Sequence, residues 1–310
     1  TTTNTNIPLT NLDLNTEYKL KVRAQNDVGS TTPYTSASTE YTRAATPSAP
    51  TADNPSTTTL DININENNNP YQTTYAIYNE TGNYYLAANG SSNGSTPIYQ
   101  STSTWGNITA INLSPNVQYE FSTRAQNQDG VLTNTSTNSS AIYTLGDKPT
   151  NLTTTTVSTS SISLSWNAGG NPAGTEYRAK NITDNSVSIG TSTNVTFDSL
   201  DPDKEYKFKV ATRNGDGTLS DYTPTTTEVT LAKTPSAFTV SNITTSSINL
   251  VWNDNGNPSD TTYEIENITS STKNIYNLLN SSQESIKEID SELDNSNQVA
   301  DKLDSHFSQV

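Results

Sequence analysis

The chain of 310 residues has no cysteine and no methionine, a single histidine, and 16 lysines and arginines against 31 acidic residues. Without cysteine, neither a disulfide framework nor a thiolate metal site can form. The lone histidine, His306, leaves almost no material for a catalytic triad or a histidine metal cluster, so we interpret it as a solvated residue. The net charge of −15 disfavours nucleic acid, whose phosphates attract basic patches.

Long apolar runs are also missing from the chain. No segment approaches the ~20 consecutive apolar residues of a membrane-spanning helix, so we expect no membrane insertion. Hydrophobic residues make up only 30% of the chain, a level that is compatible with disorder. However, 16 tyrosines, 3 tryptophans and repeated alternation of β-branched residues favour small, threonine-rich β-sandwiches.

Three stretches share one pattern, in which a leucine is followed six positions later by a tyrosine that opens an alternating strand. They read LDLNTEYKLKVRAQN, LSPNVQYEFSTRAQN and LDPDKEYKFKVATRN. The pattern is typical of a tyrosine corner, in which the ring packs under a turn and the hydroxyl bonds to backbone upstream. The leucine and tyrosine pairs are Leu12 and Tyr18, Leu113 and Tyr119, and Leu200 and Tyr206.

A second repeated marker is a strand that ends in an Asn-Pro turn. It reads SISLSWNAGGNP from Ser161 and SINLVWNDNGNP from Ser247, with a weaker copy, TLDININENNNP, from Thr59. Trp166 and Trp252 occupy the same position of this marker, where the weaker copy has isoleucine. Short strands, turn clusters and a period of ~90 residues favour a row of β-sandwiches.

With these markers in place, residues 1–274 resemble the fibronectin type III family. The resemblance implies a seven-stranded sandwich of two sheets in each complete unit. The residues that carry it are Trp166, Leu200, Pro202 and Tyr206, with Trp252, Leu113, Pro115 and Tyr119 in the neighbouring units.

We therefore predict an all-β fold of tandem immunoglobulin-like (fibronectin type III) β-sandwiches, followed by an α-helical coiled coil. The first residues are loop-like and belong to an incomplete unit, so we expect the chain to be a piece of a longer polypeptide. The predicted units are 1–46, the C-terminal half of a sandwich; 47–147, a sandwich with a protruding loop insertion at 87–97; 148–233, a sandwich; 234–274, an N-terminal half; and 275–310, a coiled-coil helix.

The coiled-coil prediction comes from a change of period after the last sandwich strand. From Ile275 the seam positions advance by alternating steps of four and three, and Ser281 with Glu284 forms a capping box that starts the helix near Ser282. Isoleucine at the second seam position favours three strands or more, with a trimer preferred, although a helix packed on its own sandwich is an alternative. The predicted oligomerisation residues are Ile286, Ile289, Leu293, Leu303, Phe307 and Val310.

Candidate chemical sites are few. The carboxylate pairs, Asp201 with Asp203 and Asp290 with Glu292, lie on turns or an exposed helix without the apolar pocket that acid catalysis needs. The Asp-Gly and Asn-Gly turns after each corner strand could offer oxygens to calcium, but hairpin turns with positive φ explain them better. We therefore expect no catalytic residue, no metal and no cofactor.

Four aromatic residues lie near the insertion of the second unit, namely Trp105, Tyr84, Tyr85 and Tyr99. They could form a platform that stacks on a sugar. Alternatively, they fill a core that Ile64 leaves small, and this second interpretation is favoured because large aromatic residues are usually well buried.

The sequence predicts a non-catalytic structural or adhesive segment of an extended extracellular fibre, on a virion or a bacterial cell surface. Its expected partners are other copies of itself, with a trimer favoured, other virion or surface structural proteins, and a cell-surface glycan. Alternatives are a spacer in a secreted polysaccharide-degrading enzyme and a carbohydrate-binding module.

Overall fold

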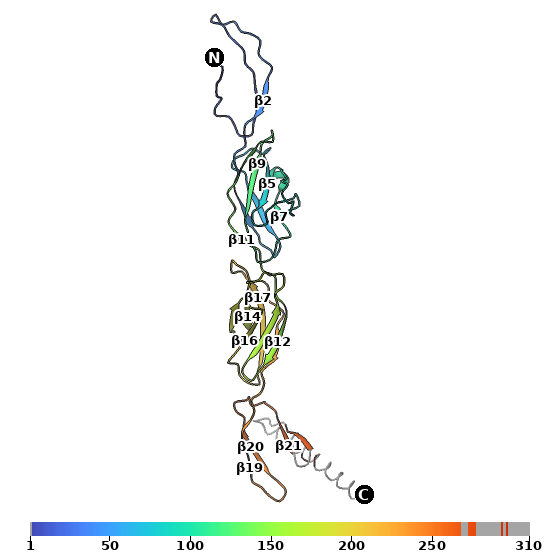
Figure 1. The fold of residues 1–310 in the computed structure, drawn as a ribbon. Coiled ribbons are helices and arrows are strands. Elements are labelled where there is room, and N and C mark those ends of the chain that lie inside the picture. Colours follow the sequence, from blue (N-terminus) through green and yellow to red (C-terminus); the bar gives the residue numbers. More distant parts are fainter. Residues whose placement is uncertain (1, 268–271, 277–292, 294–295, 297–310) are drawn as a thin grey trace, which may run out of the picture.

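The computed structural model describes residues 2–267, 272–276, 293 and 296. Its strands form four units that follow one another end to end, and every paired strand is antiparallel (Figure 1). We number them unit 1 (2–46), unit 2 (47–147), unit 3 (148–233) and unit 4 (234–276). Units 2 and 3 are complete two-sheet sandwiches, whereas the described parts of units 1 and 4 each contain one half of a sandwich.

Unit 3 has seven strands in two sheets. One sheet has the order β12-β13-β16 and the other the order β15-β14-β17-β18. The strands are β12 (Thr150–Val157), β13 (Ile162–Asn167), β14 (Glu176–Asn181), β15 (Val187–Gly190), β16 (Asn194–Phe197), β17 (Glu205–Arg213) and β18 (Thr226–Val229).

The core of unit 3 follows from alternation along its strands. In β17, Tyr206, Phe208 and Val210 are buried between the sheets, because successive side chains of a strand point to opposite faces. From the facing sheet, Trp166 meets Tyr177 edge to face, with ring centroids 5.7 Å apart.

Unit 2 repeats this architecture with additions. Its main sheets have the orders β3-β4-β7 and β10-β9-β5-β6, and a short pair joins β11 to β8. The elements are β3 (Ser48–Asp53), β4 (Leu60–Asn65), β5 (Thr74–Asn79), β6 (Tyr84–Tyr85), α1 (Thr102–Trp105), β7 (Ile108–Ala110), β8 (Gln118–Tyr119), β9 (Phe121–Gln126), β10 (Leu132–Thr135) and β11 (Ile142–Tyr143).

The insertion at 87–97 was predicted to protrude, and this prediction is wrong for its first half. The turn folds back on the sandwich, where the backbone of Ile111 donates to the carbonyl of Gly90 over 3.0 Å. Gly90 is buried with φ +81°, and a Cβ there would lie 1.8 Å from the carbonyl oxygen of Thr109. Only glycine fits this position.

Unit 1 is an extended hairpin. Its strands β1 (Glu17–Leu20) and β2 (Ser38–Tyr41) pair over four rungs, and backbone bonds continue the ladder outward to Val22 and Thr35. Leu12, Leu20 and Val22 are exposed, because the described residues of unit 1 contain no second sheet to cover them.

Unit 4 consists of two hairpins, β19 (Ser236–Ser241) with β20 (Asn249–Asn253), and β21 (Tyr263–Asn267) with β22 (Thr272–Tyr276). Strand β22 corrects the predicted start of the helical segment at residue 275. Ile275 pairs with Glu264 in a hairpin of five rungs, so the sandwich half extends to Tyr276.

The remainder of the predicted coiled coil lies outside the described residues, apart from Leu293 and Ser296, which have helical conformation. Of the predicted oligomerisation residues, Leu293 alone is described, and it is exposed. The trimer therefore stays a prediction.

Candidate functional site

Groups that could carry chemistry are dispersed in the described part of the chain. Among residues 2–267 and 272–276, no group of three potential metal-ligating side chains comes together. Asp201 is exposed and pairs with Lys204 at 2.7 Å, and this hydrogen bond and charge lower the pKa of the Asp201 carboxyl. A general acid needs the opposite shift. Its predicted partner Asp203 bonds to Thr261 instead, whereas His306, Asp290 and Glu292 lie outside the described residues.

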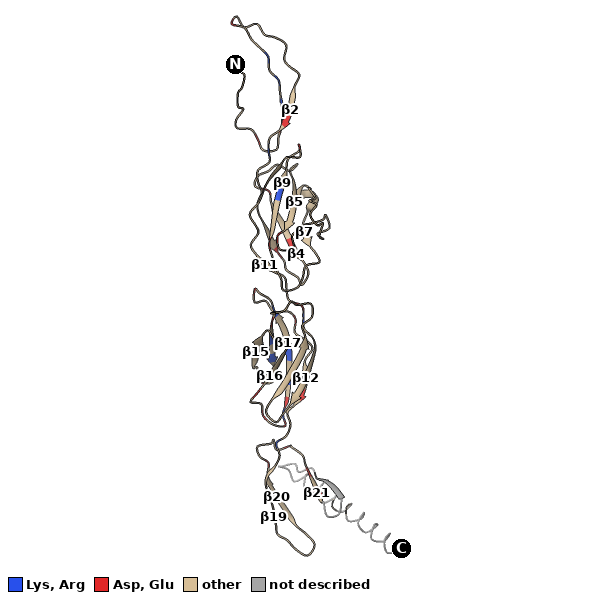
Figure 2. Cartoon of the chain, viewed as in Figure 1, with Lys and Arg blue, Asp and Glu red and all other residues tan. Residues whose placement is uncertain are grey.

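Neither the distribution of charged residues nor the length of the apolar segments indicates a further site. Figure 2 shows the lysines, arginines and acidic residues of the described chain scattered along the units. In the described segments, no helix has the length and apolar composition needed to cross a bilayer.

The three tyrosine corners have one geometry. The hydroxyl oxygens of Tyr18, Tyr119 and Tyr206 accept hydrogen bonds from backbone N–H groups five residues upstream, over 3.0, 2.9 and 2.8 Å. Tyr119 and Tyr206 are buried with their leucines, and Tyr18 is half-buried. Each tyrosine thus fixes the turn that precedes its strand. The same turns take part in the contacts between successive units, which we call joints and which have the clearest functional geometry.

The first contact at each joint is made by the asparagine of the Asn-Pro turn. The side-chain amide of Asn171 pairs with both backbone groups of Asp147, because its oxygen accepts from the N–H and its nitrogen donates to the carbonyl, both over 2.8 Å. Asn69 pairs in the same way with Ala45, over 2.7 and 2.8 Å, as does Asn257 with Lys233. A linker residue is thus fixed on the following unit at all three joints.

A second bridge comes from the turn of the tyrosine corner. Asn15 donates to Thr73 over 2.9 Å, and Asn116 donates to Thr175 over 2.8 Å, in each case across the joint. At the third joint Asp203 takes this position and accepts from Thr261 over 2.6 Å. All three bridging residues have positive φ, between 42° and 51°, a conformation that asparagine and aspartate tolerate better than most residues.

The third contact is made by the hairpin loop of the following unit. At the first joint, Asn127 donates to the carbonyl of Thr42 over 3.2 Å, and the carboxylate of Asp129 accepts from the N–H of Tyr41 over 2.8 Å. At the second joint, Asn214 and Asp216 repeat both bonds, to the carbonyl of Thr144 and the N–H of Tyr143.

These loops are the Asp-Gly turns of the sequence, and the predicted positive φ is confirmed at Gly29, Gly130 and Gly217. Their additional contact across the joint was not predicted.

Two glycines allow the second joint to close tightly. A Cβ on Gly146, in the linker, would lie 2.3 Å from a methyl group of Thr212. A Cβ on Gly215 would lie 2.3 Å from the ring of Tyr143, in the preceding unit. Because both contacts are below van der Waals distance, larger residues at either position would separate the units.

Burial strengthens the joint. Asn15, Asn127 and Asn214 are at most 4% exposed, and the receiving Thr73 and Thr175 are at most 3% exposed. Leaving a buried polar group without its partner costs ~1–3 kcal/mol, so reorienting one unit against the next breaks several such bonds together.

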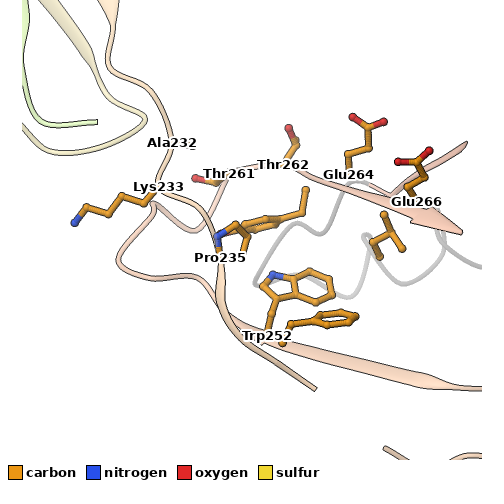
Figure 3. A pocket seen from close by; sticks show the side chains of 11 residues that line it. Ala232, Lys233, Pro235, Trp252, Thr261, Thr262, Glu264 and Glu266 are labelled. Atoms are coloured by element: carbon orange, nitrogen blue, oxygen red, sulfur yellow. The ribbon is translucent and has the colours of Figure 1, made fainter. Parts of the chain in front are cut away.

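A hollow with a volume of about 470 Å³ lies in unit 4 (Figure 3). Trp252 meets Tyr263 there edge to face at 5.5 Å, which repeats the pair of Trp166 and Tyr177 in unit 3. In unit 3, strands β16 and β17 pair with β13 and β14, which carry the corresponding residues. The described part of unit 4 has no equivalent of these two strands, so we interpret its hollow as a half-core left uncovered among the described residues.

The aromatic residues near the insertion divide between core and surface. Trp105 is in the core, as favoured from the sequence, and its Nε1–H donates to the carbonyl of Tyr75 over 2.8 Å. Tyr84 packs against the same core, whereas Tyr85 meets Tyr78 edge to face on the outer face of the sheet, with centroids 4.8 Å apart. Helix α1, which places Trp105, was not predicted.

Comparison with protein families gives one match. Residues 147–228 match the family described as fibronectin type III domain, over most of unit 3. Unit 3 has the strands expected from that resemblance, and unit 2 repeats its strand order and tyrosine corner. The chain thus carries units of this architecture in tandem. A comparison with curated proteins finds no match.

Several solved structures are similar to the chain at low identity. A two-domain fibronectin type III segment of chicken tenascin is 12% identical, with 60% of this chain and 98% of that chain covered and a TM-score of 0.36. The FN1–FN3 domains of chicken CNTN1 are 16% identical, over 69% and 75% of the two chains, with a TM-score of 0.26. A family 28 exopolygalacturonase of Yersinia enterocolitica is 22% identical over 28% of this chain and 21% of its own, with a TM-score of 0.26. All three TM-scores are below 0.5, so the assignment of unit 3 depends on the family match and the strand topology.

Proposed function

We propose that this tandem fibronectin type III protein acts as a non-catalytic, stiff structural segment of an extracellular fibre, on a virion or a cell surface. In this function the units set a distance and an orientation between whatever lies at the two ends. No reacting group is required along the rod.

The repetition of the joint carries this proposal. A flexible tether needs only a linker, whereas here an asparagine side chain fixes a linker residue at each joint and a second side chain bridges to the following unit. Linkers between independent domains are usually exposed and make few contacts. These bonds hold each unit in a fixed orientation relative to the next one. A spacer is a function that depends on such a fixed orientation.

Measurement of ¹⁵N relaxation on the full chain tests the stiffness. We expect units 2 and 3 to share one anisotropic tumbling tensor, with their long axes aligned as in Figure 1. Separate correlation times for the two units would contradict a stiff spacer.

The fibre context includes self-association through residues 277–310, with a trimer expected from the heptad pattern of the sequence. Multi-angle light scattering measures the mass of the particle directly. A trimer supports a bundled fibre, while a monomer at all concentrations would favour a single-chain spacer beside an enzyme.

A further inference from the structure

A second hollow lies on the outer face of unit 2, away from both joints. It has a volume of about 170 Å³ and opens on the sheet β10-β9-β5-β6. The side chains that define it come from three strands and the end of β10, and they are Ala76, Tyr78, Glu80, Tyr85, Arg124 and Thr135.

The same face of unit 3 is filled by large side chains. There Arg178 donates to the hydroxyl of Tyr222 over 2.9 Å, and the Nζ of Lys209 lies 4.1 Å from the centroid of the Tyr222 ring. This stack occupies the centre of the face on β14 and β17.

Strand register gives the equivalent positions in unit 2. Asn79 pairs with Phe121 as Asn181 pairs with Phe208, which aligns Ala76 with Arg178 and Ser122 with Lys209. The backbone bonds of Ser136 and Thr223 likewise align Thr135 with Tyr222. Three large side chains of unit 3 are therefore replaced by small ones in unit 2, whereas Arg124 takes the position of Ala211, so that the arginine of this rung lies on the opposite strand. The hollow is the space that remains beside Arg124 and Tyr78.

The insertion found only in unit 2 positions one wall of this hollow. Tyr85 pairs with Tyr78 of β5 on one side. On the other side, its N–H donates to the carbonyl of Gly94 over 2.8 Å and its carbonyl accepts from Asn93 over 2.8 Å. Strand β6 is thus held between β5 and the insertion, which fixes the Tyr85 backbone and places its ring against that of Tyr78.

Two charged groups complete the lining. The Nε–H of Arg124 donates to the carbonyl of Thr133 over 2.7 Å, which leaves the terminal nitrogens of the guanidinium as further donors. Glu80 accepts from the hydroxyl of Ser122 over 2.5 Å through one oxygen, and its second oxygen remains an acceptor. Fixed donors and acceptors beside aromatic rings are the usual composition of a small-molecule site.

We propose that this hollow binds one neutral pyranose ring of a surface saccharide. The C–H face of the sugar packs on the rings of Tyr78 and Tyr85, since the faces of aromatic rings carry negative charge and attract such hydrogens. Arg124 donates to ring hydroxyls, and Glu80 accepts from them. A carboxylate inside the site and the net charge of −15 oppose an anionic sugar.

Tyr99 does not line this hollow. It precedes Gln100, whose backbone pairs with that of Tyr75 in β5, and burial raises the pKa of its phenol.

Saturation-transfer difference NMR on the full chain tests the site with methyl α-glucopyranoside, methyl β-galactopyranoside and N-acetylglucosamine, and with glucuronate as the anionic probe. We expect at least one neutral sugar to bind with a Kd on the order of 1 mM, as for a ligand of this size. Glucuronate should give no signal. Absence of transfer to all neutral sugars, or transfer to glucuronate alone, would overturn the proposal.

Variants locate the binding. Tyr85→Ala should weaken it at least ~10-fold. The triple variant Ala76→Arg, Arg124→Ala and Thr135→Tyr has the unit 3 residues at these three positions, and it should abolish binding by filling the hollow as unit 3 does. Because unit 3 accommodates these side chains, the filled variant tests the site even if Tyr85→Ala does not fold. Tyr222→Ala on the equivalent face of unit 3 is the matched control and should bind as the parent does. Equal binding by the parent and the filled variant would place the sugar elsewhere and overturn the proposal, whatever the stiffness of the rod.

Discussion

Asn116 reaches from unit 2 across the joint to Thr175 of unit 3, and its amide nitrogen donates to the threonine hydroxyl over 2.8 Å. The oxygen of the same amide accepts from the N–H of Gly215 over 3.0 Å, so one side chain is held by two separate loops of the next unit. A single residue thereby fixes both sides of the contact surface.

Replacement of Asn116 by alanine should loosen this joint without unfolding either unit. Both bonds are lost, at a cost of ~1 kcal/mol each to the interface, because the Thr175 hydroxyl keeps its bond to the carbonyl of Pro172 and the exposed N–H of Gly215 bonds to water. Residual dipolar couplings should show a wider spread of orientations between units 2 and 3. Asn138→Ala, which removes an exposed bond to Glu120, is the matched control and should leave the couplings unchanged.

Gly215→Ala should separate the same two units by sterics alone. Its Cβ would lie 2.3 Å from the ring of Tyr143, so the ring or the loop must move. We expect small-angle X-ray scattering to report a broader distribution of interatomic distances and Tyr143 resonances to shift. Gly190→Ala meets no atom within 4 Å and should change neither measurement. An unchanged Tyr143 environment in Gly215→Ala would show that the two units do not meet here.

The two core tryptophans should respond differently to phenylalanine. Trp105→Phe loses packing and one of the two hydrogen bonds that the carbonyl of Tyr75 accepts, the other coming from the N–H of Gln100, so unit 2 should lose ~1–3 kcal/mol of unfolding free energy. The Nε1 of Trp166 is buried and has no hydrogen-bond partner in the described structure, so Trp166→Phe should cost unit 3 less. Urea titrations followed by the amide NMR signals of each unit measure both, because Trp105 is the only tryptophan of unit 2 and Trp166 the only one of unit 3. Equal losses would mean that the Trp105 hydrogen bond contributes nothing net.

Unit 2 should lose stability in strong alkali. Burial, with the nearby charge of Glu66 as a smaller cause, raises the pKa of Tyr75 from 10.0 to about 12. The unfolded chain therefore releases this proton first, and unfolding becomes more favourable as pH rises from about 10 to about 12, by up to ~2–3 kcal/mol. Thermal unfolding between pH 9 and 12 should show a steeper decline for the parent than for Tyr75→Phe. Parallel declines would contradict the raised pKa.

Much of the sandwich architecture could be predicted because its signals are local. Alternation around Tyr206 and the leucine six positions before it report which face of a strand is buried, and one sequence is enough to detect them. Strand β22 was missed because Ile275 satisfies both an alternating pattern and a heptad step, and pairing with β21 decides between them. Helix α1 was missed because Ser and Thr, which dominate it, have low helix propensity.

The joints could be detected but not understood from the sequence. The Asn-Pro turns were noticed as markers, yet nothing in a periodic pattern shows that Asn171 faces the linker of the preceding unit. The side chain at the fourth position of the Leu-x-x-Asn turn can form hydrogen bonds within its own loop or to the following unit. Only the fold distinguishes these two cases. The outer hollow of unit 2 was likewise visible only after strand register aligned Ala76 with Arg178.

The joints also determine geometry over longer range. Equivalent side chains make the contacts at the first two joints. Unit 1 is therefore related to unit 2 by nearly the same rotation and translation that relate unit 2 to unit 3. An array that repeats this step winds about an axis with a fixed pitch, so a feature borne by a given unit, such as the outer face of unit 2, points in a direction set by counting units. Angular position along such a fibre is then encoded in the number of repeats.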